Sequence, residues 1–135
     1  MRTDFETLHV ERIDEHILLV MYDRPEVANA KNTQMGLDQR DLFTDLYVDT
    51  EGVRCVILTG RGDKAFCAGG DLKERNGMTD ADWRRQHAIF EQAVLAMRNC
   101  PVPVIGAING AAYGGGCETA LTTDFCYASE TARFA

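Results

Sequence analysis

The chain has 135 residues, of which 45% are hydrophobic and 26% charged, a composition typical of one soluble globular domain. Its formal net charge of −7 argues against nucleic acid or an anionic membrane as the main partner. No apolar stretch is long enough to cross a bilayer, and the start "MRTDFETLHVERIDE" is too polar for a signal peptide. We therefore expect a cytoplasmic protein.

The cysteines are odd in number and form no C-x-x-C pair, and the three histidines lack metal-ligand spacing. This pattern predicts neither a disulfide framework nor a metal site, and it favours a reducing compartment. The cysteines are Cys55, Cys67, Cys100, Cys117 and Cys126.

The first 60 residues predict a β-hairpin, a helix and a third strand. "TLHVERID" and "HILLVMYD" are strand-like runs separated by Asp14-Glu15. Apolar residues then recur at helical spacing from Thr33 to Tyr47. "VRCVILTG", residues 53–60, is a short β-branched run closed by glycine, which indicates a buried strand.

The rest of the chain alternates between helix and strand. Thr79 and Asp82 form a capping pattern before a helix that runs to about Asn99, with Phe90, Val94, Leu95 and Met97 on one face, and we interpret this helix as scaffold. "VPVIGAI" indicates a strand, the glycine run opens a short helix, and "DFCYAS" indicates another strand. The order predicts one α/β domain over residues 1–135. The final "ASETARFA" reads as entry into a further strand, so we expect the domain to be incomplete at its C-terminus.

Two glycine-rich loops, "AFCAGGDL" and "AAYGGGCETA", each follow a predicted strand. Ligands of open α/β folds gather at the carboxyl ends of strands, where these loops expose bare backbone. Two backbone N–H groups aimed at one point would form an oxyanion hole. The second of them, at a helix N-terminus, would also gain from the helix dipole.

Glu118 follows Gly115 by three residues, and helical side chains lean toward the N-terminus of their helix. Its carboxylate would then share a pocket with the Gly115 N–H, which suits acid–base chemistry beside a polarised carbonyl. A second interpretation stays open at this point: the glycines permit tight packing, and Glu118 is an N3 carboxylate that satisfies the helix start. Asp71 and Lys73 are interpreted as surface charges.

Two other chemistries are less well supported. Gly60, Gly62 and Ala65 match the G-x-G-x-x-A dinucleotide fingerprint, but no helix follows them. Cys117 at a helix start is a possible thiolate, but no histidine is placed to act as its base, which favours a small buried cysteine.

Four segments together resemble the enoyl-CoA hydratase/isomerase, or crotonase, superfamily. They are "RPEVANA" (24–30), "KAFCAGGDLKE" (64–74), "PVPVIGAINGAAYGGGCETAL" (101–121) and "DFCYASETARFA" (124–135). The resemblance implies a spiral of ββα turns that binds an acyl-coenzyme A, with no cofactor because coenzyme A is part of the substrate. The positions implied to bind the substrate are Ala28, Ala68, Gly70, Asp71, Leu72, Lys73 and Gly115.

By the same resemblance, the N–H groups of Gly70 and Gly115 hold the thioester carbonyl. In the family's hydratases a glutamate at the position of Glu118 works with a second one, expected just past residue 135, to add water to C3 of a 2-enoyl-CoA. Isomerases often lack the first acid, so the resemblance favours a lyase of the hydratase type. It also implies a homo-oligomer, a trimer or dimer of trimers, assembled through C-terminal helices absent from this sequence.

Alternatives remain at this stage: isomerisation, hydrolysis, decarboxylation or dehalogenation of an acyl-CoA, or a truncated CoA-binding module without activity. The first motif departs from the family pattern, since Asn29-Ala30-Lys31 replaces the usual "NAL", and this change is expected to alter the acyl or CoA pocket. To test the hole, Gly70→Pro should be far more damaging than Gly69→Ala, because proline has no backbone N–H.

Overall fold

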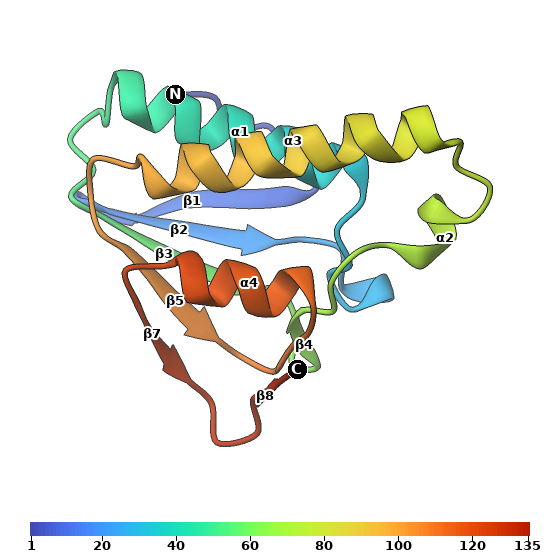
Figure 1. The fold of residues 1–135 in the computed structure, drawn as a ribbon. Helices are drawn as coiled ribbons and strands as arrows, with labels where there is room; N and C mark the ends of the chain where they lie inside the picture. Colours follow the sequence, from blue (N-terminus) through green and yellow to red (C-terminus); the bar gives the residue numbers. More distant parts are fainter.

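The computed structural model describes residues 1–135 and contains a large and a small β-sheet with helices beside them (Figure 1). In chain order the elements are β1 (Leu8–Asp14), β2 (Ile17–Tyr22), η1 (Pro25–Val27), α1 (Thr33–Val48), β3 (Cys55–Gly60), β4 (Ala65–Cys67), α2 (Leu72–Arg75), α3 (Asp80–Arg98), β5 (Val104–Ile108), β6 (Ala111–Ala112), α4 (Gly115–Thr122), β7 (Phe125–Ala128) and β8 (Arg133–Phe134). The predicted hairpin, helices and main strands are confirmed. The strand entered at the final "ASETARFA" is β8, whereas the short elements η1, β4, α2 and β6 were not predicted, because pieces of two to four residues carry no measurable periodicity.

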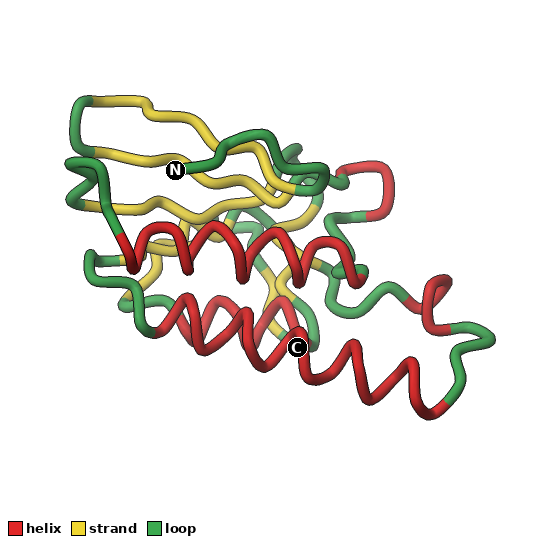
Figure 2. The backbone as a smooth tube through the Cα atoms, turned by 90° about the horizontal axis from the view of Figure 1, so that it is seen from above, coloured by secondary structure: helices red, strands yellow, loops and turns green.

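The large sheet has the order β1-β2-β3-β5-β7, in which β1 pairs antiparallel with β2 and the other neighbours are parallel. The small sheet, β4-β6-β8, is parallel throughout. Each strand of the large sheet from β3 onward is therefore followed by a strand of the small sheet, and a helical segment then leads back. Figure 2 shows α1, α3 and α4 on one side of the large sheet. This repeated ββα order confirms the predicted α/β spiral.

The core lies between the large sheet and α1. Asn32 caps α1, because its Oδ1 accepts a hydrogen bond from the Met35 N–H at 2.9 Å, and the helix then buries Leu42, Phe43 and Leu46 completely. In β2 every second residue faces inward, ending at the buried Tyr22. Truncating the fully buried Phe43 to alanine would cost about 3–5 kcal/mol.

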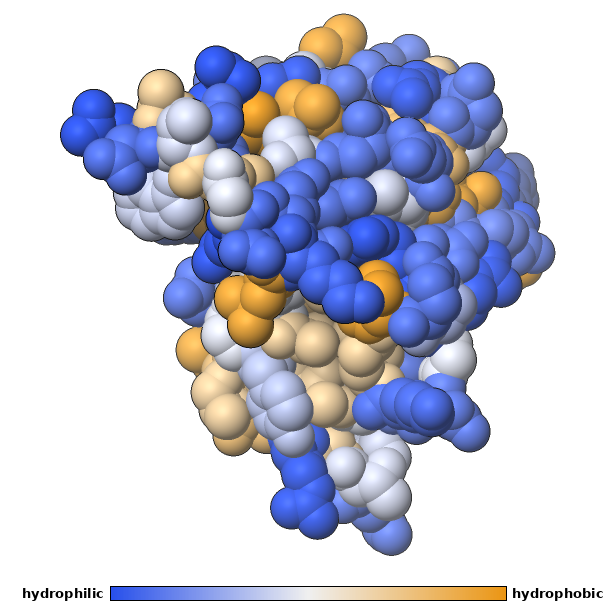
Figure 3. Space-filling view, turned by 90° about the vertical axis from the view of Figure 1, so that its right-hand side faces the viewer, coloured by the Kyte–Doolittle hydropathy of each residue, from blue (hydrophilic) through white to orange (hydrophobic).

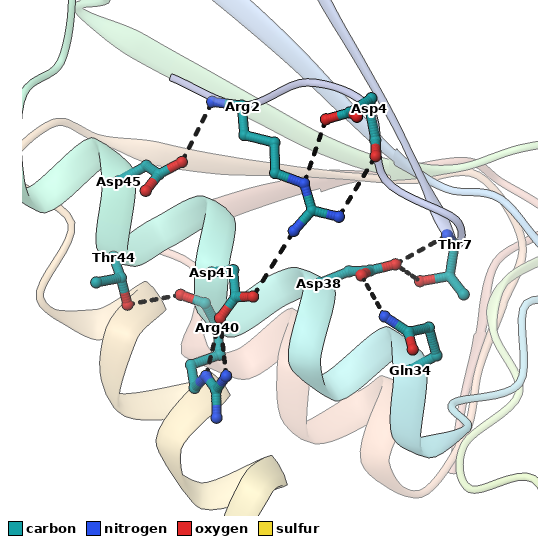
Figure 4. A network of polar contacts seen from close by, with 9 residues as sticks. All are labelled: Arg2, Asp4, Thr7, Gln34, Asp38, Arg40, Asp41, Thr44 and Asp45. Carbon is teal, nitrogen blue, oxygen red and sulfur yellow. Dashed lines mark hydrogen bonds and ion pairs between the residues drawn. The ribbon is translucent and has the colours of Figure 1, made fainter.

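Polar contacts fasten the N-terminal segment to the outer face of α1 (Figure 4). The backbone N–H and the hydroxyl of Thr7 both donate to Asp38 Oδ2, at 2.9 and 2.7 Å, and Gln34 Nε2 donates to Asp38 Oδ1 at 2.8 Å. Asp38 is buried, so these bonds compensate its carboxylate for the loss of water. Helix α1 is thus held by the sheet on one side and by residues 1–7 on the other.

Helix α3 packs against α1 and begins with the predicted capping box: Thr79 Oγ1 accepts from the Asp82 N–H at 3.1 Å, and the Thr79 N–H donates to Asp82 Oδ2 at 3.4 Å. Of the residues predicted on its apolar face only Met97 is buried; Phe90 and Val94 are half-buried, and the placement of Leu95 there is wrong, because Leu95 is exposed. The five cysteines are free. None of the helices has the length and apolar content needed to cross a bilayer.

Candidate active site

The small sheet brings the two glycine loops together. Strands β4 and β6 pair in parallel, so the loops that follow them leave the same edge side by side. The Tyr113 N–H donates to the Cys67 carbonyl at 3.0 Å. At Gly69, where φ is 96°, an added Cβ would lie 2.8 Å from the Tyr113 carbonyl oxygen and 3.6 Å from the Gly115 nitrogen. The loops are therefore in direct contact, as the oxyanion-hole hypothesis requires.

The two backbone donors named in that hypothesis are free. Gly70 forms an isolated parallel bridge with Lys31, through bonds from the Lys31 N–H to the Gly69 oxygen (2.7 Å) and from the Asp71 N–H to the Lys31 oxygen (2.8 Å). This pattern leaves the Gly70 N–H unused. Gly115 is the first residue of α4, so its N–H has no acceptor within the helix. Both N–H groups are therefore available to a ligand, and both glycines line one pocket.

This pocket has a volume of about 840 Å³ and lies between α1, α3 and the start of α4. Figure 3 shows the hollowed side of the molecule, where a polar upper part overhangs a lower part of small, weakly hydrophobic residues. The residues used below that line the pocket are Lys31, Gly70, Arg75, Gly115, Glu118 and Thr119. The structure thus brings the three predicted catalytic positions, Gly70, Gly115 and Glu118, into one cavity.

Glycine is required or favoured for a different reason at each of the three consecutive glycines at the start of α4. Gly114 has a φ of 52°, which favours glycine, and it is the N-cap of α4. A Cβ on Gly116 would lie only 2.0 Å from the Cys67 carbonyl oxygen, so glycine allows α4 to approach β4. At Gly115 a Cβ would meet nothing within 4 Å. The tight-packing interpretation is therefore right for Gly116, whereas Gly115 keeps its surroundings open.

Glu118 does not cap its helix. Since Gly114 is the N-cap, Glu118 is the fourth helical residue and not the third, and no side chain makes a capping hydrogen bond to α4. The interpretation of Glu118 as an N3 capping carboxylate is therefore wrong. The side chain is exposed and lines the pocket beside Gly115, which leaves its oxygens available to a bound water or substrate.

Lys31 connects the two loops, and sequence reasoning assigned it no role. Its backbone holds the Gly69–Asp71 segment, while its Nζ donates to Thr119 Oγ1 at 2.6 Å. Thr119 in turn donates to the Gly115 carbonyl at 2.8 Å. Burial lowers the pKa of the Lys31 ammonium, with a partial opposing effect from Cys67 and Glu118. The sequence did hint at a special position here, because Asn29-Ala30-Lys31 departs from the family pattern "NAL".

Asp71 is not a surface charge. Its side chain is 12% exposed, it accepts from the N–H groups of Lys73 (3.0 Å) and Glu74 (3.2 Å) at the start of α2, and it pairs with Arg24 at 3.0 Å. Burial alone would raise the pKa of the Asp71 carboxyl, but the Glu74 N–H and the Arg24 guanidinium outweigh it and lower the pKa. Asp71 therefore fixes the segment that follows Gly70.

The remaining predicted substrate-binding residues are not among those that line the pocket. The Ala68 N–H donates to the Ala28 carbonyl at 3.0 Å, and Ala28 itself has a left-handed φ of 54°. Leu72 and Lys73 are exposed on α2, which agrees with the interpretation of Lys73 as a surface charge. Their roles toward coenzyme A stay predictions.

The interpretation of α3 as scaffold alone is wrong, because one side of this helix forms a wall of the pocket. Trp83 and His87 stack with ring centroids 5.2 Å apart near its start, and Phe90 continues the wall. An added Cβ on Gly36 of α1 would lie 2.6 Å from the Phe90 ring, so a glycine on α1 makes room for this ring.

The structure is an α/β spiral in which two glycines with free N–H groups and a carboxylate line one pocket, and comparison with known proteins identifies the family. The model of the enoyl-CoA hydratase/isomerase family matches residues 12–135. The chain belongs to this family.

Related proteins are named as enoyl-CoA hydratases or hydratase/isomerases. The Bacillus subtilis protein YngF is 40% identical over 119 residues, which cover 88% of this chain and 45% of that protein. A crotonyl-CoA hydratase of Syntrophomonas wolfei is 33% identical over 96% of this chain and 49% of its own length. The crystal structure of an enoyl-CoA hydratase from Bacillus anthracis superposes with a TM-score of 0.91 and 36% identity, covering 96% of this chain and 50% of that one. The chain thus spans about half the length of the relatives it matches.

Proposed function

We propose that the full-length protein adds water reversibly to a 2-enoyl-CoA and forms a 3-hydroxyacyl-CoA. One observation carries the proposal: Gly70 and Gly115, whose backbone N–H groups have no acceptor in the chain, line the same pocket as Glu118, a carboxylate that does not cap its helix. The names of the relatives given above support an acyl-CoA substrate.

In this proposal the thioester oxygen accepts hydrogen bonds from both glycine N–H groups. When the oxygen of water bonds to C3, the C2=C3 electron pair moves toward the carbonyl and an enolate oxygen carries the negative charge. Donors that are already oriented stabilise this charge more in the transition state than in the bound substrate, which is the condition for rate acceleration. The N-terminus of α4 adds a favourable dipole at Gly115.

Glu118 holds the attacking water and exchanges a proton with it, so that one proton of the water reaches C2 and the hydroxyl stays on C3. Its place in the first turn of α4 aims the carboxylate back toward Gly115, since helical side chains lean to the N-terminus. The second acid that the family uses would come from the part of the protein outside these 135 residues.

The test is the turnover of crotonyl-CoA by the full-length protein, followed as the loss of the conjugated thioester absorbance. Glu118→Gln keeps the size of the side chain and removes the ionisable group. It should lower turnover by about 10²–10⁴-fold, the usual contribution of a positioned acid–base group, with binding of the CoA ester mostly retained.

Glu91→Gln is the matched control, because Glu91 is a carboxylate that lines the same pocket from α3. It should lose far less turnover than Glu118→Gln. Equal turnover in the parent and the Glu118 variant would refute the catalytic role of Glu118. A parent protein that does not hydrate short 2-enoyl-CoA esters would refute the proposed reaction.

A further inference from the structure

Lys31 is a buried lysine, and buried lysines in proteins are usually paired with a carboxylate. Its side chain is buried and lines the pocket, yet its ammonium forms no ion pair with any carboxylate of the chain. An ammonium offers three hydrogen bonds, and Nζ uses one of them, to the Thr119 hydroxyl. The Tyr22 ring, 5.3 Å from Nζ, adds a cation–π contact but accepts no ordinary hydrogen bond.

Burying a charge costs free energy unless it is paired, so the cost at Lys31 must be recovered elsewhere. The lowered pKa of Lys31 has the same cause, since burial makes the charged ammonium less favourable than the neutral amine. A carboxylate bound next to Nζ would supply the missing acceptors and reverse this effect.

Arg75 is the second cation that lines the pocket, and it is likewise free of carboxylates. Its Nε donates to Gln86 Oε1 at 3.2 Å, and its guanidinium lies against Gly70, where an added Cβ would be 2.6 Å away. Of the two pocket carboxylates, Glu91 contacts His87 Nε2 at 3.2 Å, and Glu118 forms no ion pair, although its charge partly offsets the effect of burial on Lys31. The cavity therefore has two cations whose charge is not balanced by a paired acid of the chain.

We propose that Lys31 selects acyl-CoA esters whose acyl chain itself bears a carboxylate, which the ammonium binds inside the pocket while Gly70 and Gly115 hold the thioester. Arg75, the second cation that lines the pocket, adds favourable charge for the same group. This proposal rests on the proposed hydration and names its substrate class. It also explains why a long, charged residue stands at a position where the family pattern has leucine.

The competing role for Lys31 is purely positional, because its bond to Thr119 leads on to the Gly115 carbonyl. The two roles differ in what they do to substrate preference. A positional role affects every substrate through the placement of the Gly115 N–H. A recognition role affects only substrates with the carboxylate.

The experiment compares two 2-enoyl-CoA esters of the same shape in the full-length protein. One is glutaconyl-CoA, with a terminal carboxylate; the other is 5-methylhex-2-enoyl-CoA, in which an isopropyl group replaces that carboxylate. The measured quantity is the ratio of their kcat/KM values in the parent, Lys31→Met and Thr119→Val. The threonine variant removes the same Lys31–Thr119 bond but keeps the ammonium.

We expect the parent to prefer glutaconyl-CoA, and Lys31→Met to reduce this preference by about 30-fold or more, as for the loss of one partner of a buried charge pair. Thr119→Val should slow both esters together and keep the preference. A parent that hydrates the neutral ester equally well, or a Lys31→Met variant that slows both esters equally, overturns the recognition role and leaves the hydratase proposal standing. Failure of the parent to hydrate either ester overturns the hydratase proposal instead.

Discussion

The Gly70 N–H can be removed without removing any hydrogen bond of the folded chain. Gly70→Pro deletes the N–H, which has no acceptor in the protein, while the bridge to Lys31 uses the atoms of Gly69 and Asp71 and is unaffected. Gly70 also has no left-handed φ that would exclude proline. Most of the effect of this substitution should therefore appear in catalysis and not in stability.

The expected loss follows from the number of donors. Two N–H groups serve the thioester oxygen, and loss of one oxyanion-hole donor typically costs about 2.7–4 kcal/mol, or about 10²–10³-fold in kcat. Gly70→Ala is the matched control, because it keeps the N–H and adds a Cβ whose nearest neighbours are the atoms of the Arg75 guanidinium, a side-chain end and not backbone. Alanine should therefore retain most of the turnover that proline removes.

The assay is crotonyl-CoA hydration by the full-length variants, with circular dichroism and thermal unfolding as the check on folding. Gly69→Ala, first expected to be the mild comparison, is unsuitable because its Cβ would lie 2.8 Å from the Tyr113 carbonyl oxygen at a φ of 96°. A folded Gly70→Pro variant with the turnover of Gly70→Ala would refute the assignment of this N–H to the hole.

Other substitutions test the supporting structure in the full-length protein. Gly116→Ala should lower the unfolding free energy in urea, since its Cβ would lie 2.0 Å from the Cys67 carbonyl oxygen; unchanged stability would mean that α4 does not approach β4 this closely. Asp71→Asn keeps an oxygen that can cap α2 but removes the charge that pairs with Arg24, so it should cost about 1 kcal/mol or less near pH 7. Because the pKa of Asp71 is lowered in the folded state, this difference is present above the unfolded pKa and should vanish as the pH falls through the folded pKa; a difference that does not change with pH would exclude ionic pairing with Arg24 as its source. Charge reversal at Arg84 or Arg85, both exposed and outside the pocket, should leave turnover within about twofold, and a large loss in a folded variant would place α3 closer to the chemistry.

The long elements could be predicted from the sequence because their signals are local. The alternation in β2, the recurring apolar residues of α1 and the Thr79–Asp82 capping box each depend on neighbours within one element. The glycine run also indicated the start of α4 correctly, since a φ of 52° at Gly114 and the close approach at Gly116 are requirements that only glycine meets easily.

Side-chain roles that depend on distant contacts could not be predicted in this way. Asp71 was taken as a surface charge because its partner Arg24 is 47 residues away in the chain. Lys31 and Thr119 are 88 residues apart, and only the folded chain places the amine under the start of α4. The mistaken N3 position of Glu118 arose from an error of one residue in the helix boundary, which spacing alone does not resolve.

The central claim is that Gly70 and Gly115 together bind a thioester oxygen. The most direct measurement is a crystal structure of the full-length protein with a non-reactive acyl-CoA, such as butyryl-CoA. We expect the thioester oxygen to lie about 2.7–3.1 Å from both glycine nitrogens, with the Glu118 carboxylate on the side of C3. A thioester bound outside this pocket, or an oxygen that contacts neither nitrogen, would contradict the account.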